Sequence, residues 1–173
     1  MKNLWAPWRM DYILQKKKKR RCIFCIKPKQ GEDEKDLILW RGNYTFVIMN
    51  KFPYNNGHLM VVPKRHCIEL DQLDDQEVHE LFSVLKTSLK VLKGVVHPHG
   101  FNLGMNIGKA GGAGEEHIHF HILPRWVGDT NFMPVLSETK IIPEYLDRTY
   151  QKLRTAFENL SAAKRDRRGG RKR

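Results

Sequence analysis

The chain has 173 residues, of which 40% are hydrophobic, and a formal net charge of +12 at pH 7. That length supports one domain with a real core. No stretch approaches the roughly 20 consecutive apolar residues that a membrane span needs. The first ten residues mix Trp, Arg and Pro and lack the apolar run of a signal peptide. The sequence therefore excludes a helical membrane protein and predicts a cytoplasmic location.

Most of the excess positive charge lies in two blocks. Residues Lys16–Arg21 are six consecutive cations, and Lys164–Arg173 adds seven cations against the single acid Asp166. Blocks of like charge repel themselves and usually stay solvated. We therefore expect one domain over residues 1–160, with an N-terminal arm, and a basic, disordered tail over residues 161–173. The tails favour solubility, and the alternative is weak contact with RNA or another polyanion.

The first half of the chain predicts three strands. The apolar runs Leu37–Trp40 and Tyr44–Met49 are separated by a short Gly-containing segment, which is typical of a β-hairpin. After a loop, His58–Val62 is predicted as a third strand. Pro63 closes it, because proline cannot donate to a ladder.

The second half predicts two main helices and two further strands. Apolar residues recur at spacings of three and four over Asp74–Lys93, which indicates an amphipathic helix that Asp71 or Asp74 caps and Gly94 follows. A second helix is predicted from near Pro143. The added strands are Phe101–Ile107 and His117–Leu123, the latter stopping at Pro124. This order favours an α+β fold with a mostly antiparallel five-stranded sheet and two main helices.

One predicted strand carries three histidines. A β-strand alternates faces with a period of two, so three histidines of residues 117–123 share one face and three apolar residues share the other. In this interpretation the apolar set packs on the core and the imidazoles line a surface or a pocket. The histidines are His117, His119 and His121, and the apolar residues are Ile118, Phe120 and Ile122.

This pattern suits phosphate chemistry. Imidazole is a good nucleophile near neutral pH, and its cation stabilises phosphate charge, so one ring can attack phosphorus while its neighbours carry charge or hold a metal. Gly111, Gly112 and Gly114 precede the strand and would let backbone N–H groups approach phosphate oxygens. The alternative is three unrelated surface histidines. The apolar strand and the Gly-rich loop favour a functional role.

The sequence is similar to the histidine-triad family, which includes the Hint and Fhit branches. In the family signature, three histidines alternate with apolar residues, and two apolar residues follow the last histidine. The sequence HIHFHIL at residues 117–123 matches this signature. NKFPYNNGHLMVVP at residues 50–63, residues 102–108 and Pro124-Arg125-Trp126 also fit. LWAPWRMDYI, GDTNFMPV and TKIIPE resemble the bacterial branch that contains diadenosine tetraphosphate phosphorylases. The likeness covers roughly residues 3–155.

The resemblance implies a HIT-like fold, a homodimer and a nucleotide substrate. His119 would attack the α-phosphate of a dinucleoside polyphosphate, such as diadenosine tetraphosphate, or of an AMP conjugate, and form a nucleotidyl-histidine. Water, or inorganic phosphate in a phosphorylase, would then release the nucleotide. His121 and His117 complete the implied catalytic set. The implied substrate-binding residues are Asn50 at the ribose, Asn106 and Gly114 at the phosphates, His58 in the histidine network and Trp126 as a candidate stacking partner of the base.

Two departures from the family bear on the activity. The Fhit and Hint branches often place Gln or Ser shortly before the triad, where this chain has Ala113-Gly114-Glu115-Glu116. Backbone N–H groups would then replace a side-chain donor to phosphate. In addition, Ala113 stands where characterised phosphorylases use a serine, which favours hydrolysis over phosphorolysis.

Cys22-Ile23-Phe24-Cys25 is a Cys-x-x-Cys pair, the standard short chelate for tetrahedral zinc. Many relatives add a histidine after the third strand and the first triad histidine, and these positions match His66 and His117. The resemblance therefore implies a structural Zn²⁺ site. The alternatives are a reduced, empty pair and a redox pair, although no thioredoxin-like βαβ pattern surrounds the cysteines.

Three functions remain open on the sequence. The first is a nucleotidyl hydrolase or transferase, which the complete triad, Asn50 and Asn106 favour. The second is a nucleotide-binding or interaction protein that keeps the fold with little turnover. The third is an RNA-associated factor, suggested by the basic blocks but without the aromatic and basic platform of RNA-binding sheets. The third function can coexist with the first.

Overall fold

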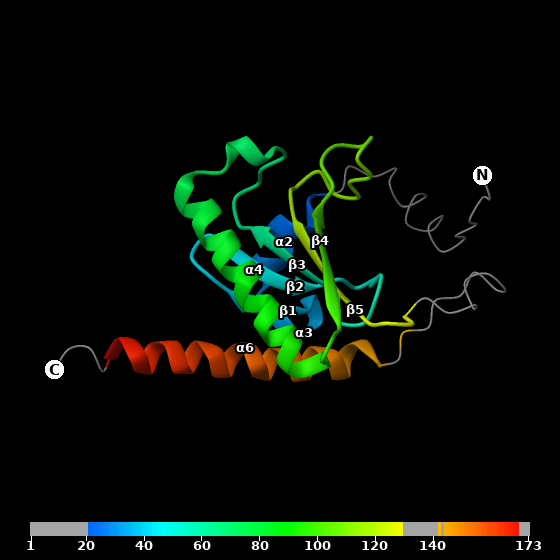
Figure 1. Ribbon diagram of the computed structural model, residues 1–173. Helices are drawn as coiled ribbons and strands as arrows, with labels where there is room; N and C mark the ends of the chain where they lie inside the picture. Colours follow the sequence, from blue (N-terminus) through cyan, green and yellow to red (C-terminus); the bar gives the residue numbers. More distant parts are fainter. Residues whose placement is uncertain (1–20, 130–141, 143, 170–173) are drawn as a thin grey trace.

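The computed structural model describes residues 21–129, 142 and 144–169 (Figure 1). Its centre is an antiparallel five-stranded sheet with the order β1-β2-β3-β5-β4. The strands are β1 (Ile38–Arg41), β2 (Thr45–Met49), β3 (Leu59–Pro63), β4 (Gly100–Met105) and β5 (Phe120–Arg125). The helices are α2 (Ile23–Gln30), α3 (Asp33–Asp36), the 3₁₀ helix η2 (Leu70–Gln72), α4 (Asp75–Val96) and α6 (Leu146–Gly169). The predicted α+β class, antiparallel sheet and two long helices are confirmed.

Helices α4 and α6 cover one face of the sheet, and α2 packs on the other (Figure 1). Alternate residues of β2 and β3 therefore enter two separate apolar clusters. Every residue of these two strands is buried. The cluster under α4 and α6 includes Val47, Val61, Leu92, Leu153 and Phe157. The cluster under α2 includes Phe24, Ile38, Phe46, Ile48, Met60 and Val62.

Helix α4 begins where the sequence predicts and ends later. The Asp74 side chain accepts the N–H of Glu77 at 2.8 Å, and the Glu77 carboxylate accepts the N–H of Asp74 at 3.0 Å. This reciprocal pair is a capping box that satisfies two N–H groups of the first turn. Gly94 lies inside the helix rather than after it, because Val95 and Val96 continue to pack against the core.

Glu80 of α4 holds the turn between β1 and β2. One of its carboxylate oxygens accepts the N–H groups of Tyr44 at 2.9 Å and Thr45 at 2.8 Å, and the other accepts the N–H of Asn43 at 3.1 Å. A Cβ atom at Gly42 would clash with the same carboxylate and with the ring of Trp40, so a larger residue there would have to displace these side chains. The hairpin and the helix are therefore joined by one carboxylate.

Strand β5 begins later than the sequence predicts, at Phe120 rather than at His117. Strand β3 pairs with only residues 120–122 of it. Upstream of that ladder, the N–H of Ile118 donates to the carbonyl of Cys67 at 2.8 Å, so the loop after β3 replaces a strand neighbour. The first two triad histidines consequently lie in an irregular segment that leads into β5.

Strand β5 also continues past the predicted stop at Pro124. Pro124 pairs with Phe101 of β4 but lies beyond the residues that β3 contacts. Its carbonyl accepts a hydrogen bond from the Asn55 side chain at 3.0 Å, outside the β3 ladder. A missing N–H at that position breaks no ladder bond, and proline is therefore tolerated.

Helix α6 continues to Gly169 and crosses the boundary that the sequence places after residue 160. Its apolar face packs on the core, where Tyr150, Leu153 and Phe157 are buried. Pro143, the N-terminal arm of residues 1–20 and the last four residues of the tail lie outside the described residues. Within the described part of the chain, no helix has the length and apolar character to span a membrane.

Candidate active site and metal centre

The triad histidines lie where the chain enters β5, on the side of the sheet that α2 covers. His117, His119 and His121 are only 0%, 5% and 8% exposed. The sequence predicts imidazoles that line a surface or pocket, and the structure instead buries them. The reason is that α2 packs the ring of Phe24 against His117 and His119. Hydrogen bonds in such a dry site are stronger than in water.

His119 keeps one ring nitrogen unbonded. Its Nδ1 atom lies 2.8 Å from the carbonyl oxygen of His117, and a carbonyl only accepts, so Nδ1 carries the proton. Nε2 then holds the lone pair and makes no hydrogen bond to any described residue. Burial lowers the pKa of His119, which keeps the ring neutral near pH 7. This is the state of a histidine that can act as a nucleophile.

A chain of hydrogen bonds assigns the tautomer of His121. The N–H of Tyr54 donates to His58 Nδ1 at 3.2 Å, so a neutral His58 ring has its proton on Nε2. That atom lies 2.9 Å from His121 Nδ1, which accepts, and the His121 proton is on Nε2. Burial, followed by repulsion from His119, lowers the pKa of His121 to about 4. His121 is therefore a neutral ring that offers one N–H donor.

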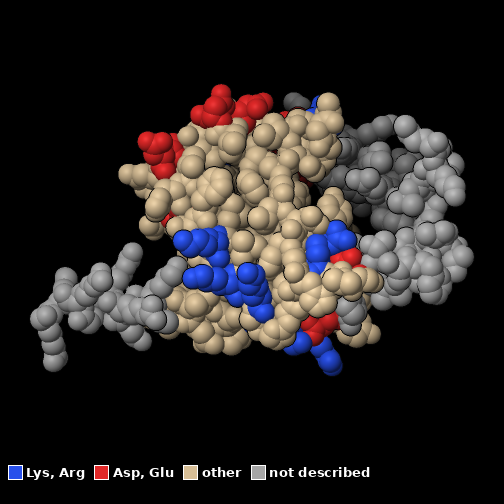
Figure 2. Space-filling model, in the orientation of Figure 1, with Lys and Arg blue, Asp and Glu red and all other residues tan. Residues whose placement is uncertain are grey.

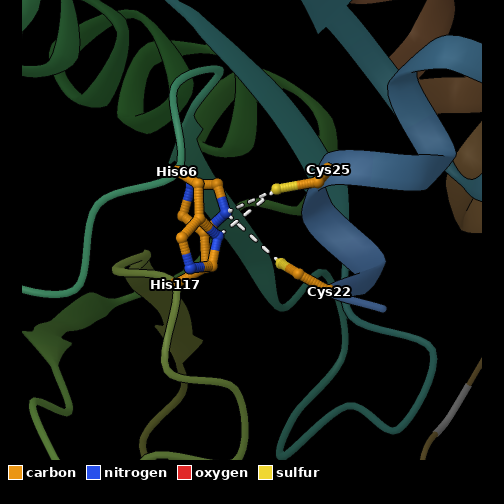
Figure 3. Close-up of side chains that lie close together, drawn as sticks. All are labelled: Cys22, Cys25, His66 and His117. Carbon is orange, nitrogen blue, oxygen red and sulfur yellow. Dashed lines mark hydrogen bonds between the residues drawn. The ribbon is translucent and has the colours of Figure 1, made fainter. Parts of the chain in front are cut away.

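Four side chains of metal-binding type meet beside the triad (Figure 3). The sulfur atoms of Cys22 and Cys25 lie 3.4 Å and 3.6 Å from His117 Nδ1, and that of Cys25 lies 3.3 Å from His66 Nδ1. Cys22 caps α2 and Cys25 lies in its first turn, while His66 belongs to the loop after β3. The structure therefore brings together all four residues that the sequence predicts for zinc.

The spacing of this cluster suits a tetrahedral metal ion. Zn–S bonds of about 2.3 Å and Zn–N bonds of about 2.0–2.1 Å place sulfur and nitrogen ligands about 3.6 Å apart, close to the distances above. His117 Nε2 donates to the carbonyl of Pro63 at 3.0 Å, so its Nδ1 lone pair faces the sulfur atoms. Burial raises the pKa of the Cys22 thiol to about 11, so a cation is needed to hold a thiolate there.

The polar residues predicted to bind substrate lie at loop positions around the histidines. The side-chain carbonyl of Asn50 accepts the N–H of Phe52 at 2.9 Å, so its NH₂ group is the part directed to other partners. The side-chain NH₂ of Asn106 is 3.5 Å from the carbonyl of Gly112. Gly114 lies in the exposed turn that precedes His117.

The glycine-rich turn uses part of its backbone within itself. The N–H of Gly112 donates to Lys109 and that of Ala113 to Gly108, both at 3.1 Å. Gly108 and Gly112 have φ values of 67° and 82°, which glycine adopts without strain. These two N–H groups therefore serve the turn itself.

Trp126 lies at the opposite end of β5 from the histidines. Its indole N–H donates to the carbonyl of His97 at 3.1 Å. A strand rises about 3.3 Å per residue, which puts the Trp126 backbone about 16 Å from that of His121. The structure does not bring Trp126 together with the triad in this chain.

Sequence reasoning missed Phe24 as part of the site. Its ring centroid lies 4.9 Å from that of His119 and 5.7 Å from that of His117. The available signal was its position between two cysteines predicted to bind the same metal. A short helix that carries both ligands must bring the residue between them near the first triad histidine.

Known proteins share this fold and histidine pattern. Residues 31–127 match the HIT domain. AP-4-A phosphorylase of Mycobacterium tuberculosis is 40% identical over 165 residues, which are 91% of this chain and 85% of that protein. The structure of a histidine triad nucleotide-binding protein from Sulfolobus tokodaii is 30% identical, with a TM-score of 0.65 over 80% of this chain and 93% of that one. A Zn-bound histidine triad family protein from Mycobacterium smegmatis, 24% identical, has the same fold, with a TM-score of 0.66 over 82% and 96%.

The domain match contains all five strands and the histidines of the site. The M. tuberculosis relative extends the likeness over most of the chain, including the part that carries Cys22 and Cys25. The two similar structures share the fold of this chain. The chain is a member of the histidine triad (HIT) family.

Proposed function

We propose that the protein is a nucleotidyl hydrolase or phosphorylase that acts on dinucleoside polyphosphates, such as diadenosine tetraphosphate, or on AMP conjugates. The observation that carries this proposal is the state of His119. Its ring is buried and neutral, Nδ1–H is anchored to a carbonyl, and the Nε2 lone pair has no partner among the residues that the structure describes. The 40% identity to a protein named AP-4-A phosphorylase supports the substrate class.

In the proposed reaction, His119 Nε2 attacks the α-phosphorus. A P–N bond forms, the bond from phosphorus to the leaving nucleotide's oxygen breaks, and the electron pair stays with that oxygen. The ring becomes cationic, and the hydrogen bond from its Nδ1–H to the His117 carbonyl strengthens. The His121 Nε2–H hydrogen-bonds the leaving oxygen and stabilises its charge. Water or inorganic phosphate then attacks the same phosphorus, which breaks the P–N bond and frees His119.

The other site residues bind the substrate in this proposal. Asn50 contacts the ribose through its side-chain NH₂, since its carbonyl holds the Phe52 N–H. Asn106 and Gly114 contact phosphate oxygens, and His58 holds the His121 tautomer. Trp126 takes part in base binding only if a substrate reaches the far end of β5.

The cluster of Cys22, Cys25, His66 and His117 holds one structural Zn²⁺ in this proposal. The donor types and the Cys–His separations support it. With four protein ligands, a bound zinc ion supplies a cross-link between α2, the β3 loop and the triad segment. His117 then contributes its imidazole to the metal and its backbone carbonyl to His119.

The family resemblance predicts a homodimer, and the open side of the edge strand β4 supports this prediction. Strand β4 has a neighbour on one side only in the described sheet. Phe82 on α4 and Leu103 on β4 are 57% and 49% exposed. Exposed side chains of this size are the kind that a second copy would cover.

Contact with polyanions is proposed for the basic parts of the chain. Figure 2 shows cations over the lower half of α4, where Lys86, Lys90 and Lys93 are exposed, and acidic groups near the start of that helix.

The division into a domain over residues 1–160 and a tail over residues 161–173 rests on sequence composition. So does the cytoplasmic location.

Incubation with diadenosine tetraphosphate, with and without inorganic phosphate, tests the proposed activity. AMP plus ATP identifies hydrolysis, and ADP plus ATP identifies phosphorolysis. Ala113 predicts that AMP plus ATP prevails, whereas the name of the M. tuberculosis relative points to ADP plus ATP. Tight binding of the dinucleotide and of AMP conjugates without any product would overturn the enzyme proposal and identify a nucleotide-binding protein.

A further inference from the structure

Phe24 touches both the metal cluster and the proposed nucleophile. It lies on α2 between Cys22 and Cys25 and is 2% exposed. Its ring centroid is 4.9 Å from that of His119 with 47° between the ring planes, and 5.7 Å from that of His117 with 85° between the planes. One aromatic side chain therefore packs on two imidazoles with different proposed roles.

The ring of His119 needs such a contact to have a fixed orientation. The hydrogen bond from Nδ1 to the His117 carbonyl anchors one edge of the ring. The second side-chain torsion of histidine has a broad, shallow energy profile, so a single hydrogen bond still lets the ring tilt. The neighbouring imidazole of His121 contacts it at a centroid distance of 4.6 Å, but in the proposed reaction that ring also hydrogen-bonds the leaving oxygen. Phe24 is the rigid, buried partner.

The position of Phe24 is set by the cysteines on either side of it. Helix α2 is eight residues long and contains Pro28, and its N-cap side chain makes no capping hydrogen bond. So short a helix has little stability of its own. The thiols of Cys22 and Cys25, within 3.3–3.6 Å of His66 and His117, tie its first turn to the triad segment.

We infer that Phe24 is a positioning residue for the reaction, which holds the plane of the His119 ring so that Nε2 points at phosphorus. The inference rests on the proposed function. The Cys-x-x-Cys segment thus has a second purpose, because it carries the side chain that orients the nucleophile. A misplacement of about 1 Å in a reacting group can cost about 10²-fold in rate, so a packing contact of this kind can control kcat.

Phe46 supplies a matched control. It belongs to the same apolar cluster and is 0% exposed, but its ring contacts no histidine ring among the described residues. Phe24→Leu and Phe46→Leu remove the same atoms from the same cluster. Only Phe24→Leu removes the aromatic ring that packs against the His119 ring. Phe24→Met is the second variant, because it fills the site with a flexible chain in place of a rigid ring.

The experiment measures kcat and KM for diadenosine tetraphosphate, with zinc content and thermal unfolding of each variant. We expect Phe24→Leu and Phe24→Met to lower kcat at least tenfold, with KM within about twofold and zinc content unchanged. Phe46→Leu should match Phe24→Leu in lost melting temperature but keep kcat within about twofold. Equal kcat losses in the Phe24 and Phe46 variants would overturn the inference, as would unchanged kcat in both Phe24 variants.

The ¹⁵N spectrum of the His119 imidazole separates this inference from the proposed function. The wild-type protein and Phe46→Leu should show the Nδ1–H tautomer alone. Phe24→Leu should show averaging between the two tautomers as the ring tilts away from the His117 carbonyl. A wild-type protein without turnover defeats the proposed function, and the spectrum then decides the role of Phe24 by itself. An unaltered His119 spectrum in Phe24→Leu contradicts that role.

Discussion

His117 and His119 are two residues apart, both buried, and have opposite ring nitrogens available. His117 donates its Nε2–H to the Pro63 carbonyl and turns the Nδ1 lone pair to the cysteines. His119 donates its Nδ1–H to the His117 carbonyl and keeps the Nε2 lone pair. Identical side chains on one short segment thus present opposite lone pairs, which suits the roles proposed for them, His117 as a metal ligand and His119 as a nucleophile. The difference is made by which backbone carbonyl each ring can reach.

Backbone groups determine which nitrogen of each triad histidine carries its proton. His121, the third histidine, accepts at Nδ1 because the N–H of Tyr54 has already oriented His58. The tautomer of each ring is fixed by one backbone group, directly or through a neighbouring ring. We expect the largest effect from a change to the His119 ring, followed by changes to the metal cluster, to the protonation of the buried His58–His121 pair and to the tail.

The largest effect is expected for His119→Ala. Loss of a covalent nucleophile should lower kcat for diadenosine tetraphosphate by about four orders of magnitude while substrate binding survives. Product formation by chromatography and binding by calorimetry measure the two quantities. His79→Ala, at an exposed position of α4, is the control and should leave both unchanged. Near-normal turnover in His119→Ala would show that another group makes the bond to phosphorus.

The next largest effect is expected at the metal cluster. The purified protein should contain about one zinc per chain, and Cys25→Ser should contain almost none. We expect the melting temperature of Cys25→Ser to fall by roughly 10 °C, the shift that a few kcal/mol produces in a chain of this size. Metal analysis and calorimetry check both values. Cys67→Ala removes a buried cysteine outside the cluster and should keep its zinc, so zinc loss in that variant would contradict the assignment.

A smaller effect on stability is expected when acid protonates the buried His121. Burial lowers the pKa of His121 to about 4 from its ordinary 6.5, so the unfolded chain takes up this proton before the folded protein does. The free energy of unfolding is therefore highest above pH 6.5 and declines as the pH falls toward 4. Urea unfolding at several pH values should show a steeper decline for the wild-type protein than for His121→Gln. Parallel curves would mean that His121 does not differ between the folded and unfolded states.

The smallest effect on catalysis is expected from the tail. Deletion of Lys164–Arg173 removes seven cations and one acid, yet touches none of the site residues. Turnover of the dinucleotide should stay within roughly threefold. Binding to RNA should weaken and lose salt dependence, because each lost phosphate contact releases about one counterion fewer. A large fall in kcat would instead place the tail over the active site.

Apolar runs bounded by turn residues were enough to predict the strands, and period-two alternation predicted the shared side of the triad. Alternation does not say where a ladder ends, and the bond from Ile118 to Cys67 moves the start of β5 to Phe120. Nor does it predict burial of the histidines, which depends on α2. That helix lacked the usual signals, since its cap is a cysteine without a capping bond and Pro28 lies inside it.

The metal cluster could be predicted residue by residue, and the roles of single nitrogens could not. Cys22 and Cys25 follow from the Cys-x-x-Cys spacing, whereas His66 and His117 follow from the positions that the family resemblance implies. The tautomers depend on contacts made by backbone groups, such as the Pro63 carbonyl and the Tyr54 N–H. Every residue has a carbonyl and every residue except proline has an N–H, so residue types do not reveal which of these groups will be used.

The carboxylate of Glu80 has a consequence for how the molecule opens. It accepts the N–H groups of residues 43–45 from a position 35 residues beyond Thr45 in the chain. These amides exchange with deuterium only when their bonds to α4 break, so loss of the β1–β2 ladder alone does not expose them. We expect their exchange rates to equal those of the first turns of that helix, which would make the hairpin tip and the helix one cooperative opening unit. In Glu80→Gln the two sets of rates should separate, and the hairpin tip should exchange first.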